Sequence, residues 1–142
     1  MGNIDNEFFN SFLKNAADYA AELFSIDNEI VEMVRDLDSI ESSAAKNEMS
    51  LSLLKNEISN NVVNDSQYKN DKQRNVAIID LFHSDDRYKY LIKEMESIKS
   101  AKLLKEAEIK KFEIKKRFNE KMFRISLLRG EWIIAYKNGE SK

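Results

Sequence analysis

The chain contains no cysteine and no proline, and its 142 residues include only three glycines. The absence of cysteine excludes disulfides and thiolate metal sites. Glycine and proline mark most tight turns, and neither occurs between residues 3 and 129. A β-rich fold of this length needs several such turns, so the composition favours a few long helices.

The sequence also has few of the residue patterns that carry catalysis. Its single histidine, His83, precedes Ser84 and Asp85, but catalytic triads are assembled in space and not by adjacency. It has no glycine-rich phosphate loop, no calcium-loop spacing and no pair of histidines for zinc. We therefore expect a protein that is not an enzyme, with no catalytic residues, no metal and no cofactor.

Long apolar runs are missing as well. No stretch approaches the roughly 20 apolar residues that cross a bilayer, and the first residues are acidic and lack the shape of a signal peptide. We expect a soluble chain that does not bind a membrane.

The first half of the chain carries a regular heptad pattern. Its positions follow one another at alternating steps of three and four, which keeps one face of a helix against a partner helix. The pattern predicts a helix over residues 5–60, in which Ser25 and Asp27 offer a signal for an internal break. The fifteen positions, which we call the α-seam, are Phe9, Phe12, Ala16, Tyr19, Leu23, Ile26, Ile30, Met33, Leu37, Ile40, Ala44, Asn47, Leu51, Leu54 and Ile58.

Only Asn47 interrupts the apolar series of the α-seam. A polar residue in such a seam sets register or oligomeric state at some cost in stability. The other interpretation is that the helix is locally exposed beside Lys46 and Glu48. We expect the seam to support an oligomer through Ile30, Leu37, Ile40, Asn47, Leu51 and Leu54.

A connection and a short helix follow. Residues 61–70 are rich in Asn, Asp and Ser, which favour turns and caps. Asn70 is expected to cap a helix over residues 71–83 whose apolar face holds Val76, Ile79 and Phe82.

The second half predicts another long helix, over residues 84–136. Ser84 or Asp85 provides its cap, and Asn138 with Gly139 is expected to end it. Lysines interrupt its apolar positions at Lys111 and Lys121, and Gly130 is expected to loosen its last turns. The apolar positions are Leu91, Met95, Ile98, Leu104, Ala107, Ile114, Phe118, Ile125, Leu128 and Trp132.

These elements predict an all-α fold, a long antiparallel helical hairpin or coiled coil with a short intervening helix, as a single helical domain over residues 1–142. Such a hairpin is thin, so it leaves apolar side chains uncovered unless it associates. We therefore also expect a homo-oligomer.

Charge is divided unevenly between the two halves. Residues 1–67 hold 13 acidic and 4 basic residues, whereas residues 68–142 hold 12 acidic and 19 basic residues. An acidic helix packed antiparallel to a basic one is electrostatically matched. Alternatively, the basic helix binds phosphates, with Phe112, Phe118 and Phe123 stacking on bases, or the acidic helix imitates nucleic acid. The candidate nucleic-acid-binding residues are Lys102, Lys105, Lys110, Lys111, Lys115, Lys116, Arg117, Lys121 and Arg124.

The connection carries a motif, Asp65-x-x-Tyr68-Lys69-Asn70-x-Lys72-x-Arg74, followed by an apolar segment and by Asp85-Asp86-x-Tyr88 at the start of the long basic helix. Over residues 60–125 this arrangement resembles a group of small helical proteins of phages and prophages with a Tyr-x-Asn-Glu-Lys-x-Arg segment. Asp71 stands where that group usually has Glu. The resemblance implies no chemistry, but it implies work around nucleic acid or host defence in the cytoplasm of a bacterial host.

The same segment has a physical interpretation of its own. Lys72 and Arg74 lie in the first turn of a helix, where the helix dipole disfavours cations. They serve either a partner or the acidic first helix. The candidate partner-binding residues are Tyr68, Lys69, Asn70, Lys72 and Arg74.

The sequence thus suggests a non-enzymatic, phage-type interaction protein that binds and modulates a nucleic-acid-handling complex, such as a CRISPR-type host defence system. The expected partner is a protein complex of the host or phage, with nucleic acid as a possible further ligand. Two alternatives remain open. One is a recombination accessory protein that binds single-stranded nucleic acid through the basic C-terminal helix, and the other is a purely structural coiled coil.

Overall fold

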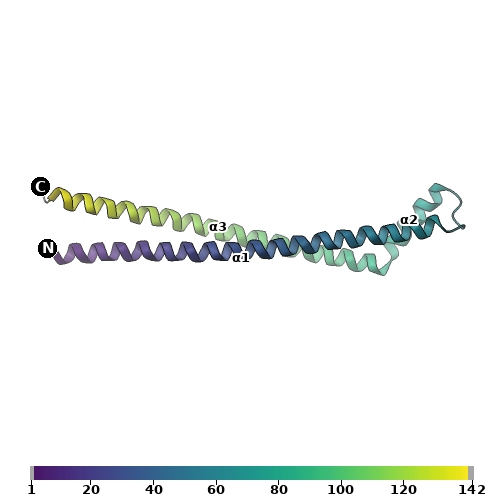
Figure 1. Cartoon of the computed structure of the whole chain (residues 1–142), viewed down its shortest axis with the longest axis horizontal. Helices are drawn as coiled ribbons and strands as arrows, with labels where there is room; N and C mark the ends of the chain where they lie inside the picture. Colours follow the sequence, from purple (N-terminus) through teal and green to yellow (C-terminus); the bar gives the residue numbers. More distant parts are fainter. Residues whose placement is uncertain (1, 141–142) are drawn as a thin grey trace. The chain divides into compact units, whose positions relative to one another are not determined.

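The chain forms three helices in the range that its computed structural model describes, residues 2–140. They are α1 (Gly2–Val63), α2 (Asp71–Ser84) and α3 (Asp86–Glu140). The two long helices pack against each other in opposite directions, with α2 between them in the chain (Figure 1). This confirms the predicted all-α hairpin, although residues 1 and 141–142 of the predicted domain lie outside the described range.

The α1 helix extends beyond both of its predicted ends, whereas α3 begins two residues after its predicted start and extends beyond its predicted C-terminal end. The α1 helix passes through Ser25 and Asp27 without a break, so the regular seam outweighs the local capping signal. The predicted end of α3 at Asn138 and Gly139 is wrong, because both residues lie inside the helix. A glycine cap needs a positive φ, and none occurs in the described residues. None of the described helices is both long and apolar enough to cross a membrane.

The contacts divide the chain into two units, residues 1–34 with 107–142 and residues 35–106. Each unit contains a stretch of α1 packed on a stretch of α3. The second unit also contains α2 and a compact apolar cluster. The buried residues of this cluster are Leu54, Ile58 and Val62, and the partly buried ones are Tyr68, Ala77, Ile78, Phe82, Tyr88 and Leu91.

The α2 helix begins where the sequence predicts, but it is rotated from the predicted face. The Asn70 side-chain oxygen accepts a hydrogen bond from the backbone N–H of Gln73 at 2.9 Å, which confirms the cap. Phe82 packs against the cluster as expected, whereas Val76 and Ile79 are more than half exposed. Ala77 and Ile78 take their place. Six of the seven residues from 76 to 82 are apolar, so only the packing of α2 against α1 selects the buried face.

All fifteen α-seam positions are buried or half-buried in the single chain, as the heptad pattern predicts. The facing positions of α3 keep the same alternation of three and four, and they too are buried or half-buried. We call these positions the inner seam of α3. Its residues are Tyr88, Leu91, Met95, Ile98, Lys102 and Lys105 in the second unit, and Ile109, Phe112, Lys116, Asn119, Phe123, Ser126, Gly130, Ile133 and Lys137 in the first.

The apolar face predicted for α3 is therefore correct only at its start. Leu91, Met95 and Ile98 belong to the inner seam, but the apolar positions predicted after them are exposed. The inner seam carries several polar residues beyond residue 98. Beyond that point the apolar spacing in the sequence therefore marks the exposed face of α3 and not the buried one. The exposed residues are Leu104, Ala107, Ile114, Phe118, Ile125, Leu128 and Trp132.

Gly130 is a packing residue and not a weak point of the helix. It is buried in the inner seam, and a Cβ atom added to it would lie 2.2 Å from Cζ of the Phe12 ring. The missing side chain thus makes room for Phe12 against the α3 backbone. Phe12 is half-buried there, which fixes the register of this pair of helices in the first unit.

Asn47 is buried, with 4% of its surface exposed, so the interpretation of a locally exposed helix is wrong. Its side-chain N–H donates to the carbonyl oxygen of Leu91 on α3 at 3.1 Å. Its side-chain oxygen has no hydrogen-bond partner. A buried polar atom without a partner costs stability, so Asn47 ties α1 to one position on α3 at an energetic cost.

We predict that Gly130→Ala destabilises the chain by about 1 kcal/mol. Alanine favours the helix by about 1 kcal/mol, but displacing the packed Phe12 ring costs about 1–3 kcal/mol. In a Phe12→Ala background the same change should instead stabilise, because the clash is gone. Thermal and urea unfolding of the four proteins of this cycle measures both effects, and equal effects in the two backgrounds would show that Phe12 does not lie over Gly130.

We predict that Asn47→Leu stabilises the chain by roughly 1 kcal/mol, because it removes a buried oxygen that lacks a partner. The Leu91 carbonyl, which lies inside a helix, keeps its backbone partner one turn on. The matched control is Asn56→Leu on the exposed side of α1, where a change within about 0.5 kcal/mol is expected. A lower melting temperature for Asn47→Leu than for the control would refute this account.

Candidate interaction surfaces

The candidate nucleic-acid-binding residues divide into two groups, and the first group pairs with the acidic helix. In the second unit, Lys102 Nζ lies 3.5 Å from the Glu41 carboxylate, and Lys105 Nζ lies 3.5 Å from Asp36. Both lysines are half-buried at inner-seam positions. Their apolar stems cover the seam while their charged ends reach the carboxylates of α1.

The first unit repeats this arrangement. Lys115 Nζ lies 3.1 Å from Glu22, and Lys116 Nζ lies 2.7 Å from Asp27. The hydrogen bond to Asp27, more than any other contact, raises the pKa of Lys116 above its ordinary value. Lys115 also lies over the ring of Phe112, with its Nζ 5.8 Å from the ring centre. Four of the nine candidate bases are therefore engaged with α1, as the electrostatic matching of the two helices predicts.

The second group consists of five bases on the exposed side of α3 that make no ion pair within the described residues. These are Lys110, Lys111, Arg117, Lys121 and Arg124. The sequence placed all nine bases on one helix, but it did not separate those that face α1 from those that face solvent. That separation depends on where the inner seam lies. The inner seam contains polar residues, so the apolar pattern of the sequence does not reveal its position.

An apolar strip runs along the same exposed side of α3. We call Ile114, Phe118, Ile125, Leu128 and Trp132 the outer strip, and each is at least 42% exposed. Each of these residues comes two positions after a member of the inner seam, which turns it by about 200° around the helix axis. The start of the outer strip therefore points away from α1 within the first unit, whereas Ile125, Leu128 and Trp132 also border a groove that Phe8 of α1 lines. Exposed apolar rows of this kind mark interaction sites more often than isolated apolar residues do.

Basic residues line both edges of the outer strip. Arg117 and Arg124 each follow an inner-seam residue by one position, and Lys115 and Arg129 each precede one by one position. Lys111 and Lys121 lie in the row of the strip itself. Near its C-terminal end, Phe8 of α1 joins Ile125, Leu128, Arg129, Trp132 and Ile133 around a largely apolar groove of about 450 Å³.

The candidate partner-binding residues of the connection have mainly structural contacts. Tyr68 packs against the apolar cluster and Asn70 caps α2. The Lys69 backbone N–H donates to the Gln73 side chain at 3.0 Å. Arg74 pairs with Asp71 at 3.3 Å, on its own helix and not on α1.

Tyr68 and Lys72 nevertheless line one hollow of about 600 Å³ together with residues of α2. The hollow has both polar and apolar walls. The other residues around it are Gln67, Gln73, Val76, Ala77, Asp80 and Leu81.

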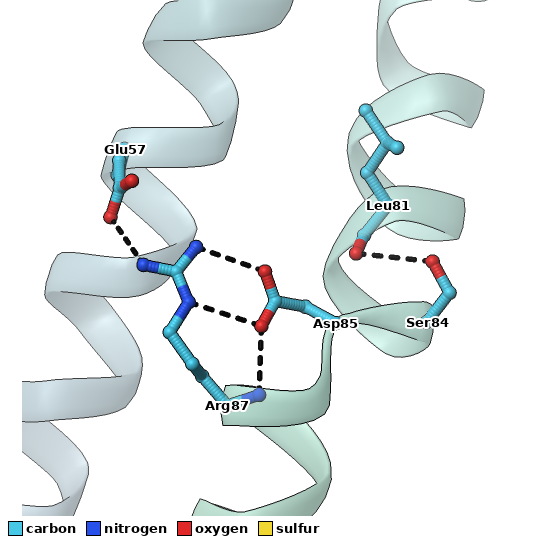
Figure 2. A network of polar contacts seen from close by, with 5 residues as sticks. All are labelled: Glu57, Leu81, Ser84, Asp85 and Arg87. Atoms are coloured by element: carbon cyan, nitrogen blue, oxygen red, sulfur yellow. Dashed lines mark hydrogen bonds and ion pairs between the residues drawn. The ribbon is translucent and has the colours of Figure 1, made fainter.

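Sequence reasoning missed Arg87, which joins the start of α3 to α1 (Figure 2). Its guanidinium donates to both oxygens of Asp85, from Nε at 3.1 Å and from Nη2 at 3.0 Å, and its Nη1 donates to Glu57 at 3.0 Å. The Asp85 carboxylate also caps α3 by accepting the Arg87 backbone N–H at 2.8 Å. These hydrogen bonds from the Arg87 side chain lower the pKa of Asp85 below its ordinary value.

The His-Ser-Asp string does not assemble into a catalytic arrangement. The His83 ring stacks on Tyr88 with 5.0 Å between ring centres, and the Ser84 hydroxyl donates to the Leu81 carbonyl at 3.3 Å. Asp85 is held by Arg87. In the described residues no three histidine, cysteine or acidic side chains gather as a metal site would require.

We predict that reversing Lys115 and Lys116 to Glu lowers the melting temperature, because it places negative charge against Glu22 and Asp27. Reversing Lys110 and Lys111 in the same way should leave the melting temperature almost unchanged, since neither has a partner on α1. The two double variants carry the same charge change and so control for each other. Circular dichroism melts at low and high salt would measure the difference, which should shrink as salt screens the charges. Equal melting temperatures would contradict the separation of the bases into two groups.

Comparison with protein family models, with curated proteins and with solved structures found no match for this chain.

Proposed function

We propose that this chain is a non-enzymatic interaction protein that binds and modulates a nucleic-acid-handling complex, for example as an inhibitor of a CRISPR-type host defence system in the bacterial cytoplasm. The observation that carries the proposal is the outer strip of α3, an exposed apolar row with basic edges. The choice of a nucleic-acid-handling complex rests on the resemblance to small phage and prophage proteins.

The composition of the outer strip favours a protein partner over a naked strand. Three of its five residues, Ile114, Ile125 and Leu128, are aliphatic and have no aromatic face on which a base stacks. A protein surface buries aliphatic and aromatic side chains alike, and the bases at the edges then add charge complementarity.

Direct binding of single-stranded nucleic acid, as by a recombination accessory protein, is the second candidate. It is supported by the five bases of α3 that lack a partner on α1 and by Phe118 and Trp132, which are 61% and 71% exposed. Against it stand the four lysines that already pair with carboxylates of α1. A binder of this kind would lose affinity steeply with salt.

A purely structural coiled coil, with or without a homo-oligomer, is the third candidate. The six residues expected to form an oligomer seam, Asn47 among them, are buried or half-buried inside one chain. An oligomer that keeps these contacts within the chain would use other surfaces, such as the outer strip or the exposed apolar residues of α1.

We predict that Leu128→Glu abolishes capture of the partner, because it places a charge in the middle of the apolar contact. Leu53→Glu on α1 is the matched control, since Leu53 and Leu128 are 61% and 62% exposed. The measurement is a pull-down from bacterial cells that express the tagged chain, with and without nuclease treatment, in which bound proteins and nucleic acids are both identified.

The expected result is stoichiometric, nuclease-resistant capture of a nucleic-acid-handling protein by the parent and by Leu53→Glu but not by Leu128→Glu. Capture of nucleic acid alone, lost when Lys110 and Lys111 are reversed, would instead favour the recombination accessory. Capture of neither by any variant would leave the structural coiled coil.

A further inference from the structure

The outer strip keeps the spacing of a coiled-coil seam. With Ala107, Lys111 and Lys121 included, its row runs from residue 107 to residue 132 in unbroken alternating steps of three and four. The row inherits this period from the inner seam, which α3 keeps turned toward α1. A row with this period stays in register with a further helix over its whole length.

The charges around the row define the helix that fits it. Residues 107–132 hold eight bases and four glutamates, and the strip and its edges receive most of the bases. Glu113 and Glu120 come three positions before an inner-seam residue and so lie toward α1, whereas Glu108 and Glu131 lie on the edges of the row. The edge bases outnumber these two glutamates; they are Lys110, Lys115, Arg117, Arg124 and Arg129. A basic helix would be repelled by this face, whereas an acidic helix places its carboxylates opposite the cationic edges.

The chain itself shows this pairing on the opposite side of the same helix. There α1, an acidic heptad helix, packs its apolar residues on α3 and offers Glu22 to Lys115 and Asp27 to Lys116 at 3.1 and 2.7 Å. The outer strip presents the same combination of apolar residues and bases to solvent.

From these contacts we propose that the outer strip binds an acidic amphipathic helix of a protein partner, aligned with α3, whose carboxylates face Lys111 and Lys121. The proposal rests on the proposed function, because it names the chemistry of the partner surface. Lys111 and Lys121 lie within the apolar row, so the partner helix needs acidic residues inside its own seam at two positions ten residues apart. This requirement selects acidic helices in one register over general apolar surfaces.

The same two lysines argue against a lipid surface as the occupant. A membrane would have to accept both ammonium groups within the inserted row or let their side chains bend out toward the headgroups. A facing helix satisfies them directly with carboxylates.

Trp132 gives a direct signal for the test, since it is the only tryptophan of the chain and is 71% exposed in the strip. The probe is a designed acidic peptide of four heptads with leucine at the seam, glutamate on both edges and two glutamates in the seam to face Lys111 and Lys121. The control peptide has the same leucines and lysine in place of every glutamate. Both are titrated into the full chain at physiological salt while the Trp132 emission is recorded.

We expect the acidic peptide to shift the Trp132 emission to the blue and the lysine peptide to leave it unchanged. Phe118→Glu should weaken binding by about tenfold or more, because it buries a charge in the contact, while Leu53→Glu should bind as the parent does. Circular dichroism of each variant verifies that the helices remain. The double variant Lys111→Glu with Lys121→Glu leaves every apolar contact in place and tests the contribution of the two lysines to peptide binding.

Equal binding of the two peptides, or no binding of the acidic peptide, would overturn the inference. So would a blue shift produced by phosphatidylserine vesicles or by a single strand of DNA but not by the acidic peptide. A dimer mass in light scattering that Leu128→Glu reduces to the monomer would assign the strip to a second copy of the chain and overturn it as well.

The inference and the proposed function fail in different ways. If the acidic peptide does not bind but Leu128→Glu still abolishes partner capture from cells, the function stands and the acidic helix is wrong. If the peptide binds as expected but capture does not depend on Leu128, the binding surface is supported and the proposed function is lost.

Discussion

The packing of the α-seam against α3 is the constraint on which the other features of this protein depend. The α-seam is apolar at fourteen of its fifteen positions, so α1 has to bury that face against a helix. The α3 helix meets it with a seam of the same period, although lysines, an asparagine, a serine and a glycine occupy many of its positions. Once this face of α3 is turned inward, the apolar residues on its other side are left in contact with solvent.

Most polar residues of the inner seam make a local contact that compensates for their burial. Lysines such as Lys105 and Lys116 cover the seam with their stems and reach carboxylates of α1. Asn119 is 7% exposed and donates to the Lys115 carbonyl at 2.9 Å. Gly130 accepts the Phe12 ring. Asn47 on α1 is only half satisfied, which fits a residue that fixes the register of the pair more than it stabilises the fold.

The division of the bases follows from the same packing and leaves one group of them open to a partner. Four bases at or beside the inner seam pair with carboxylates of the acidic helix, and these pairs match part of the opposite charge of the two halves of the sequence. Bases further around α3 have no such partner and lie beside exposed apolar residues. A surface that combines unpaired bases with exposed apolar residues suits a protein helix better than a phosphate backbone, because only a protein helix offers apolar area as well as negative charge.

The sequence by itself determined the elements of this protein. The scarcity of glycine and proline, the heptad of the α-seam and the caps at Asn70 and Asp85 were enough to predict three helices and their order. These signals are local, because periodicity and capping depend on residues within a few turns of one another. The pairing of basic with acidic helix was also predictable, since it needs only the two charge totals and an antiparallel hairpin.

Only the tertiary structure decided which faces are buried. In α2 and in most of α3 more than one face carries apolar residues at helical spacing, and periodicity cannot choose between them. Packing against α1 decides which face is buried. The seam and the carboxylates of α1 pack on the face of α3 that carries Lys116 and Asn119, and the face that carries Phe118 and Leu128 stays exposed. Arg87 could not be found from its neighbours for the same reason, because one of its partners, Glu57, lies thirty residues away on another helix. The free energy of packing decides which distant segments make contact, and a single sequence does not show which segments these are.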